Sequence, residues 1–354
     1  THGNILSNMN QIYIWMMPVF KVGQEVGITA LPMYHIFSLT VNCLSFMRLG
    51  ISNVLVTNPK DIDSYVKILK ETKFTVTTGV NTLFNALMNH PQFGSIDFSK
   101  CKVSVAGGMA LQTAVAARWR ELTGTPIAEG YGLTESSPVV CCNLLDGNDR
   151  PGSIGLPLPD TDVKIVDEDG NEVKMGQSGE IWVKGPQVMQ GYWQNPTETA
   201  NILTPDGWLK TGDIGIVDPD GFFKVVDRKK DMILVSGFNV YPNEIEDVLV
   251  MHPKVLEVAA VGYPDPHSGE VVKVFIVPKT DDLTEDEIKK FAKKELSKEI
   301  KSALMNLEKG KIKVEMICYI PGISAPGSTD FDLYINDKKL DCSRKISSSI
   351  YNRS

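Results

Sequence analysis

The first 150 or so residues alternate short apolar, β-branched runs with stretches of helical spacing. Between Asp61 and Glu71 the apolar residues recur every three or four positions, as on one face of a helix. A second helix is predicted to end near Leu122. The runs predicted as strands are 27–32, 52–56, 74–78 and 102–106. Strands that alternate with helices indicate an α/β fold with a layered, mostly parallel sheet.

The pattern changes between Gly152 and Val226, where the apolar runs are short and turn residues separate them. Strands are predicted at 163–166, 180–183, 214–217 and 222–226. The last two flank Asp218-Pro219-Asp220-Gly221, a strong turn signal. We therefore expect a small antiparallel β subdomain, a barrel or a sheet, attached to the α/β part.

A charged run, 227–231, precedes a third pattern. Here a helix at 243–251 is followed by strands at 255–261 and 271–277 and by a helix that begins at Thr284. Glu287 stands three residues after Thr284, the spacing of a capping box. This pattern predicts a smaller C-terminal α+β domain, with a hinge in the charged run.

The predicted organisation is a partial large domain at 1–227, with an α/β part at 1–150 and a β-rich part at 151–227. A small mobile domain follows at 228–296. The remainder, 297–354, is an atypical tail that ends in serine-rich, polar sequence, and we expect it to be partly disordered.

Charge and cysteine content exclude several classes of protein. The net charge of -7 argues against a nucleic-acid partner, which would need a basic face. The six cysteines show no CxxC pairing or disulfide framework, and the five histidines form no zinc-ligand cluster, so we expect a cytoplasmic protein with reduced thiols. The sequence shows no secretory signal peptide, and the apolar stretch from Ile12 to Phe20 is too short to span a bilayer.

The segment YGLTES, 131–136, is a candidate nucleotide loop. Tyr131 can stack on a base, and Gly132 lets the backbone approach a ligand closely. Thr134 offers a hydroxyl to a phosphate oxygen, and Glu135 offers a hard oxygen ligand to Mg²⁺. Taken alone, the six residues are equally well explained as a tight turn.

Other segments carry weaker signals of the same kind. Asp213, in Thr-Gly-Asp, can accept two hydrogen bonds from a ribose diol, although it is also a common turn residue. Arg228 can pair with a ribose or phosphate oxygen through its planar fork, although the charged run around it is also typical of a solvated linker. Gly237 would let a narrow ligand pass the backbone.

Gly107, Gly108 and Met109 follow a predicted parallel strand, at the end where open α/β sheets bind ligands.

The order of these motifs resembles the adenylate-forming superfamily. The segments that carry the resemblance are 131–136, 152–159, 178–193, 207–215 and 227–246. The sequence of the segment 227–246 is similar to bacterial long-chain acyl-CoA synthetases in particular. So are LPMYHIF at 31–37 and HPKVLEVAAVGYPDPHSGE at 252–270. The resemblance covers about residues 1–296.

The resemblance implies a two-step reaction. A fatty acid carboxylate attacks the α-phosphorus of Mg-ATP to give acyl-AMP and pyrophosphate, and the thiol of coenzyme A then displaces AMP. It implies that Thr134 and Glu135 serve phosphate and Mg²⁺. It implies an adenine and acyl pocket and further nucleotide contacts formed by Gly107, Gly108, Met109, Tyr131 and Gly132.

The same resemblance implies roles for five further residues. Asp213 and Arg228 would hold the ribose. Lys230 would be the hinge of the small domain, and Gly237 would line the pantetheine tunnel. His35 would lie between the acyl and pyrophosphate sides, whereas its apolar setting alone favours a buried core histidine. Peripheral association with the inner face of the cytoplasmic membrane and a homodimer are left open.

Two expected segments of the family are not found in this sequence. A Ser/Thr/Gly-rich phosphate loop would precede a segment like THGNI, where the chain starts with Thr1 instead of Met. A PKxxxGKIxRR-like segment would close the small domain, and the chain shows only Ser343-Arg344-Lys345-Ile346, without the glycine. We therefore expect a chain that begins partway through a longer protein and ends in unrelated sequence.

Three functions are consistent with these observations. The first is a long-chain fatty acid–CoA ligase, of which this chain is a truncated or variant form. The second is a nucleotide- or acyl-adenylate-binding remnant that does not turn over. The third is an adenylating ligase of another carboxylic acid, such as a luciferase-like or peptide-synthetase domain.

Overall fold

The computed structural model describes residues 1–235, 238–265, 269–280 and 282–296, and the backbone at 312–316, 333–335 and 338–340. The chain divides into two compact units, Thr1–Val225 and Val226–Ser354, each described below by itself. Within the described residues, no helix combines the length and the apolar character that a membrane crossing requires.

The first unit is built on a seven-stranded sheet with the order β2-β1-β3-β4-β5-β6-β7. The pairs among β1 to β5 are parallel, whereas β6 pairs antiparallel with both β5 and β7. The strands are β1 (Val26–Thr29), β2 (Ser52–Leu55), β3 (Val76–Gly79), β4 (Val103–Ala106), β5 (Ile127–Gly132), β6 (Val139–Cys142) and β7 (Leu156–Pro157).

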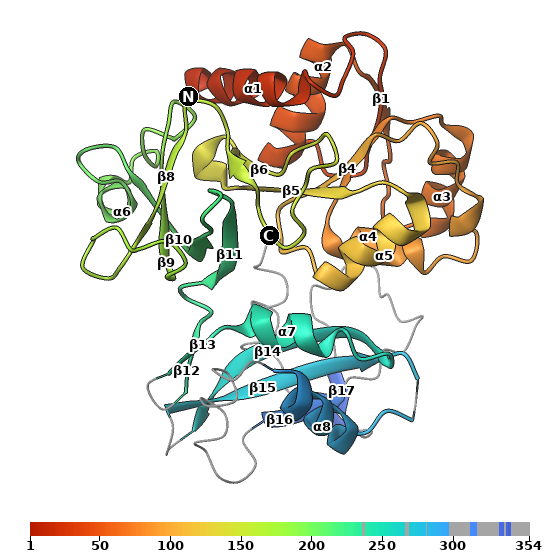
Figure 1. The fold of residues 1–354 in the computed structure, drawn as a ribbon, viewed down its shortest axis with the longest axis vertical. Helices are drawn as coiled ribbons and strands as arrows, with labels where there is room; N and C mark the ends of the chain where they lie inside the picture. Colours follow the sequence, from red (N-terminus) through yellow and green to blue (C-terminus); the bar gives the residue numbers. More distant parts are fainter. Residues whose placement is uncertain are drawn as a thin grey trace. The chain divides into compact units, whose positions relative to one another are not determined.

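Helices cover both faces of this sheet, because neighbouring strand residues point to opposite sides. Ile127 of β5 packs in the core that includes α3, α4 and α5, whereas Ala128 packs in the core that includes α1, η1 and α2 (Figure 1). The helical segments are α1 (His2–Met16), η1 (Ser38–Ser45), α2 (Phe46–Leu49), α3 (Ile62–Glu71), α4 (Asn81–Met88), η2 (Phe93–Ser95), α5 (Thr113–Thr123) and η3 (Thr134–Ser136).

A second, four-stranded sheet with the order β11-β10-β9-β8 follows in the chain. Strand β9 pairs antiparallel with both β8 and β10. Ile165, Ile181 and Val183 bury one face of it against β6 residues of the first sheet. Its elements are β8 (Asp162–Val166), β9 (Gly179–Lys184), α6 (Pro196–Ile202), β10 (Leu209–Val217) and β11 (Phe223–Arg228).

The second unit is an α+β structure. Its sheet has the order β13-β12-β15-β14, with β16 paired parallel to β15. Ile245, Leu249 and Ile288 bring α7 and α8 into one core with the sheet. The elements are β12 (Ile233–Val235), β13 (Phe238–Val240), α7 (Pro242–Leu249), β14 (Val255–Asp265), β15 (Gly269–Pro278), α8 (Glu285–Glu295), β16 (Ile312–Met316), β17 (Leu333–Ile335) and β18 (Lys338–Leu340).

The predicted fold class is confirmed: a mostly parallel layered sheet, a small antiparallel subdomain and a smaller α+β domain. The helix expected from Asp61 is α3, in which the Asp61 carboxylate accepts a hydrogen bond from the Ser64 N–H as N-cap. The Thr284 hydroxyl caps α8 by accepting from the Glu287 N–H. Most of 297–354, including much of the expected disordered tail, lies outside the described residues.

Strand β5 of the parallel sheet was not among the predicted strands, and two further features of the structure differ from the sequence expectations. Helix α1 was not predicted, because its buried side chains include the polar Asn8 and Gln11, which hide the apolar periodicity. The charged run at 227–231 is not a wholly solvated linker: Asp227 is buried and accepts hydrogen bonds from the N–H groups of Arg228 and Asn243.

Gly155 tests how closely the chain before β7 approaches β6 within the seven-stranded sheet. Its φ is +87°, and a Cβ there would lie 2.1 Å from backbone atoms of Cys142. We expect Gly155→Ala to lower the free energy of unfolding by more than about 2 kcal/mol. Gly170 has the same φ of +87° and open space around it, so Gly170→Ala should cost only about 1 kcal/mol.

Urea unfolding followed by circular dichroism measures both losses. Equal losses for the two variants would show that the close approach to Cys142 contributes nothing beyond backbone strain.

Candidate functional site

A hydrogen bond between two sheets forms the centre of the candidate site. The hydroxyl of Tyr131, near the end of β5, donates to Asp213 Oδ2 on β10 at 2.5 Å. Asp213 is only 7% exposed. Burial and the neighbouring carboxylate raise the pKa of Tyr131 well above its ordinary value, so the hydroxyl remains a donor. Residues 82 positions apart thus meet, with the Asp213 carboxylate held in a fixed orientation.

The direction of Asp213 is set by an irregularity in β10. The register of β10 against β9 shifts between Lys210 and Ile214, as in a β-bulge, which re-aims the side chains it contains. Gly212 there has a φ of +74°, and its N–H donates to Glu180 Oε1 at 3.0 Å. The Asp213 N–H donates to the Thr211 hydroxyl oxygen at 3.1 Å. The Thr-Gly-Asp sequence is therefore a bulge that presents a carboxylate.

The loop after β5 turns sharply at Gly132. A Cβ at this position would lie 1.9 Å from the carbonyl oxygen of Pro138, so the close approach requires glycine. Thr134 and Glu135 follow in the short helical turn η3, where Thr134 is exposed and Glu135 half-buried. The tight-turn interpretation of this segment is thus correct for its backbone, and the turn presents the two side chains that were predicted to serve phosphate and metal.

The glycines after β4 lie beside β5. A Cβ on Gly107 would lie 3.2 Å from the carbonyl oxygen of Gly130 and 3.0 Å from the ring of Phe37. Gly108 has a φ of +81° with open space around it, and Met109 is 41% exposed. These residues and the Tyr131 loop follow neighbouring parallel strands at their carboxyl ends, where open α/β sheets bind ligands.

His35 is exposed, so the alternative of a buried core histidine is wrong. Its Nδ1 accepts a hydrogen bond from the Phe37 N–H at 3.2 Å, which fixes the ring locally. Since the Phe37 ring packs on Gly107, His35 lies on a segment that contacts the glycine loop.

Three predicted residues belong to the second unit. Arg228 is half-buried at the end of β11, and Lys230 is exposed in the turn that follows. Gly237 lies outside the described residues. The structure thus brings Tyr131 and Asp213 together within the first unit and describes Arg228 and Lys230 in the other.

Tyr192 is a site residue that the sequence reasoning missed. Its hydroxyl donates to Glu135 Oε1 at 2.7 Å. Burial, with a further contribution from the Glu135 carboxylate, raises the pKa of Tyr192 to about 12. Tyr192 lies within the segment 178–193 that carries the family resemblance, but spacing alone gives no reason to single it out.

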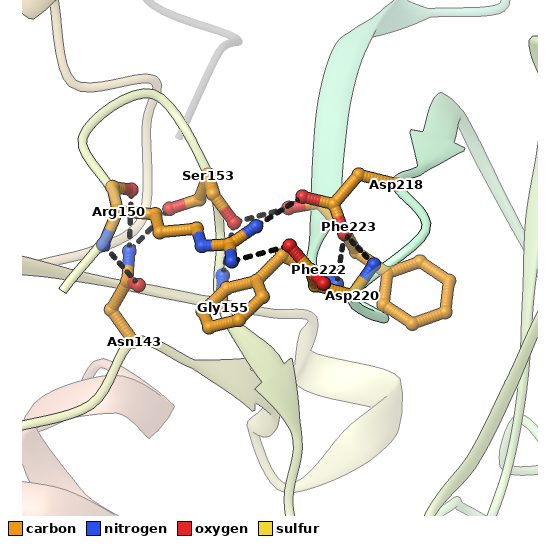
Figure 2. Close-up of polar contacts among 8 residues, drawn as sticks. All are labelled: Asn143, Arg150, Ser153, Gly155, Asp218, Asp220, Phe222 and Phe223. Carbon is orange, nitrogen blue, oxygen red and sulfur yellow. Dashed lines mark hydrogen bonds and ion pairs between the residues drawn. The ribbon is translucent and has the colours of Figure 1, made fainter. Parts of the chain in front are cut away.

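Arg150 was also missed, and it links the two sheets away from the site. Figure 2 shows its guanidinium pointing from the segment that carries Asn143 and Ser153 toward the turn after β10. Its two terminal nitrogens donate to Asp218 Oδ2 and Asp220 Oδ2, each at 2.7 Å. The guanidinium also stacks 4.1 Å from the centre of the Phe222 ring.

Backbone pairing reinforces this contact. Phe223 donates its N–H to the Gly155 carbonyl at 3.0 Å, and its own carbonyl accepts from the Ser153 hydroxyl at 2.8 Å (Figure 2). The same carbonyl also accepts from the Ile154 N–H at 2.9 Å. The turn at 218–221 directly follows β10, the strand that carries Asp213.

The chain belongs to the AMP-binding enzyme family. The family model "AMP-binding enzyme" matches residues 1–193, and the model "AMP-binding enzyme C-terminal domain" matches residues 244–304. The order of the two matches agrees with the order of the two units.

Two of the chain's curated relatives are long-chain-fatty-acid–CoA ligases. The chain is 55% identical over 297 residues to a long-chain-fatty-acid–CoA ligase of Escherichia coli O6:H1, covering 84% of this chain and 53% of that protein. It is 52% identical over 301 residues to the ligase of the same name from Haemophilus influenzae, again covering 84% and 53%. The chain therefore spans about half the length of the curated relatives it matches.

Solved structures show the same fold. The crystal structure of ATP-bound MatB from Rhodopseudomonas palustris superposes with a TM-score of 0.78 at 29% identity, over 89% of this chain and 60% of that one.

The Arg150 contact predicts a dependence of stability on pH. Partial burial alone would raise the pKa of Asp218, but backbone N–H donors and the Arg150 charge bring it below its ordinary value of 3.8. The stabilisation is therefore full above that value and is lost as the pH falls through the lower folded-state pKa. We expect Arg150→Met to be less stable than the wild type at pH 7, with a smaller difference in acid.

Thermal unfolding between pH 7 and pH 3 checks this expectation. Arg118→Met is the matched control, because Arg118 donates to two neutral oxygens, those of the Asn89 side chain and the Met88 carbonyl. A stability difference for Arg150→Met that stays constant with pH would contradict the assignment.

Proposed function

We propose that this chain is part of a long-chain fatty acid–CoA ligase that forms AMP. The observation that carries the proposal is the buried Asp213 carboxylate, held by Tyr131 beside a glycine-bounded loop at the carboxyl ends of parallel strands. A carboxylate in this setting suits a ribose diol, since it accepts two hydroxyl donors and discriminates against a ligand that lacks them. The identity of 55% to a long-chain-fatty-acid–CoA ligase supports a fatty acid as the substrate and coenzyme A as the acceptor of the acyl group.

The first step joins the fatty acid to AMP. An oxygen of the fatty acid carboxylate bonds to the α-phosphorus of ATP, the bond from that phosphorus to the bridging oxygen breaks, and pyrophosphate leaves. In this proposal Asp213 and Arg228 hold the ribose. The rest of the nucleotide and the acyl group contact the two glycine-containing segments, Gly107, Gly108 and Met109 after β4, and Tyr131 and Gly132 at the end of β5. Thr134 donates its hydroxyl to a phosphate oxygen, and His35 lies between the acyl and pyrophosphate sides.

The described residues fit a Mg²⁺ ion that arrives with the nucleotide. They contain no group of three or more His, Cys, Asp or Glu side chains that could hold an ion by themselves. Mg²⁺ commonly binds through one or two carboxylates, phosphates and water, so Glu135 with the phosphates of ATP is a suitable set. The ion would neutralise phosphate charge during the transfer.

The second step transfers the acyl group. The thiol of coenzyme A gives up its proton to solvent, its sulfur bonds to the acyl carbonyl carbon, and the bond from that carbon to the phosphate oxygen breaks, so that AMP leaves. We propose that Gly237 lines the path of the pantetheine and that Lys230 is the hinge of the small domain. Lys230 is exposed in a turn shortly after the boundary between the two units, which supports its assignment as the hinge.

Binding of AMP to the 354-residue chain tests the nucleotide site. Calorimetry should give a dissociation constant of about 1 mM or tighter, or about -4 kcal/mol. Asp213→Asn should weaken binding by about 10- to 100-fold, because a charged acceptor is lost while Tyr131 keeps a partner. Asp169→Asn, in an exposed turn, is the control. No heat at millimolar AMP, or equal affinity for Asp213→Asn, would refute the assignment.

The hinge is tested by Lys230→Pro in a full-length form of the protein. Proline fixes φ near -65°, so the variant should slow thioester formation more than adenylation. Lys230→Ala keeps backbone freedom and is the matched control. Single-turnover assays separate the two half-reactions, and Lys230 is not the hinge if the proline variant matches the wild type in both steps.

A further inference from the structure

Glu135 and Tyr192 come from loops that are far apart in the sequence and meet side chain to side chain. Glu135 lies in η3 after β5, and Tyr192 lies in the loop between β9 and α6. The Tyr192 hydroxyl donates to Glu135 Oε1 at 2.7 Å. Among the residues that the structure describes, no other hydrogen bond to the Glu135 side chain is recorded.

The loop that carries Tyr192 is held by several backbone contacts. The Met189 N–H donates to the backbone carbonyl of Glu135 at 2.7 Å, which joins the two loops a second time. The Tyr192 N–H donates to the Thr199 hydroxyl at 2.9 Å, and the Tyr192 carbonyl accepts from the Asn195 N–H at 3.2 Å. Tyr192 is therefore a donor whose backbone is already fixed before any ligand arrives.

The packing of Gly191 supports the same conclusion. A Cβ at Gly191 would lie 2.7 Å from Thr199, so the turn into Tyr192 is close against α6. On the other side, the Asn4 side chain of α1 donates to the Val188 carbonyl at 2.9 Å. The loop is restrained at both ends, and a restrained loop gives a donor of defined direction.

A single carboxylate that serves Mg²⁺ needs such a donor. The terminal torsion of a glutamate side chain has a broad energy profile, so a half-buried carboxylate samples many orientations. Mg²⁺ requires nearly ideal octahedral geometry at short distances. A hydrogen bond to one carboxylate oxygen restricts the rotation and leaves the other oxygen for the ion, as outer-shell donors do at metal sites in general.

We propose that Tyr192 is a positioning residue for Glu135, which orients the carboxylate so that it can bind the Mg²⁺ of the nucleotide. This inference rests on the proposed function, because it takes Glu135 to be the metal ligand. Tyr192 itself contacts neither metal nor substrate in this assignment. Because only the Tyr192 hydroxyl orients Glu135, removal of that one oxygen atom should weaken metal binding.

Binding of Mn²⁺ in the presence of ATP tests the proposal on the 354-residue chain. Electron paramagnetic resonance counts free Mn²⁺, and comparison with the same ATP without protein gives the Mn²⁺ affinity of the protein–ATP complex without any turnover. We expect Tyr192→Phe to weaken Mn²⁺ binding by about 10-fold or more, the effect typical of a lost outer-shell partner. Glu135→Gln removes the proposed ligand and sets the lower limit of affinity.

Tyr13→Phe is the matched control, because it also removes one hydroxyl while keeping the ring that stacks 4.4 Å from the Arg48 guanidinium. It should leave Mn²⁺ binding unchanged. Circular dichroism establishes that each variant keeps the wild-type fold.

Rescue by metal distinguishes positioning from a merely structural role. In a full-length form, an excess of Mg²⁺ should restore the adenylation rate of Tyr192→Phe, whereas a distorted loop would not recover. Equal Mn²⁺ affinity for the wild type and Tyr192→Phe, or failure of Mg²⁺ to restore the rate, overturns the role of Tyr192 alone. A wild-type chain that binds no Mn²⁺ with ATP overturns the proposed metal role of Glu135, and this inference with it.

Discussion

Two of the directional contacts between the four-stranded and the seven-stranded sheet lie at or next to β10, the strand that carries Asp213. At one place Tyr131 donates to Asp213. At the other, Gly155 pairs with Phe223 and Arg150 bridges the carboxylates of the following turn. Burial of apolar residues between the sheets supplies attraction without direction, whereas these hydrogen bonds select one relative position. Strand β10 runs from Asp213 to the turn that Arg150 bridges.

The two carboxylates of the candidate site, Asp213 and Glu135, have the same kind of hydrogen-bond donor. Each accepts a hydrogen bond from a tyrosine hydroxyl that a different segment supplies, Tyr131 for Asp213 and Tyr192 for Glu135. A hydroxyl donor orients a carboxylate without neutralising its charge, unlike a lysine or arginine partner. The Tyr192 hydroxyl therefore orients Glu135 without cancelling the charge that a cation would need.

Much of the fold followed from local patterns in the sequence. Strands β1 to β4 of the parallel sheet, α3 with its Asp61 cap and α8 with its Thr284 cap were each predicted within a few residues of their observed bounds, whereas β5 was not predicted. Helix α1 was missed because its buried face is partly polar: Asn8 and Gln11 donate to backbone carbonyls of distant segments. Such partners cannot be seen from the spacing of residues along one helix.

The sequence by itself determined the fold class and the motifs at the ends of strands, because propensity, turn chemistry and apolar period act over a few neighbouring residues. It pointed to Tyr131, Glu135 and Asp213 individually. Only the tertiary structure decided which side chains hold them, since Tyr131 meets Asp213 across 82 positions and Tyr192 meets Glu135 across 57. The physical reason is that a hydrogen bond depends on distance and angle in space, and the packing of two separate sheets sets both.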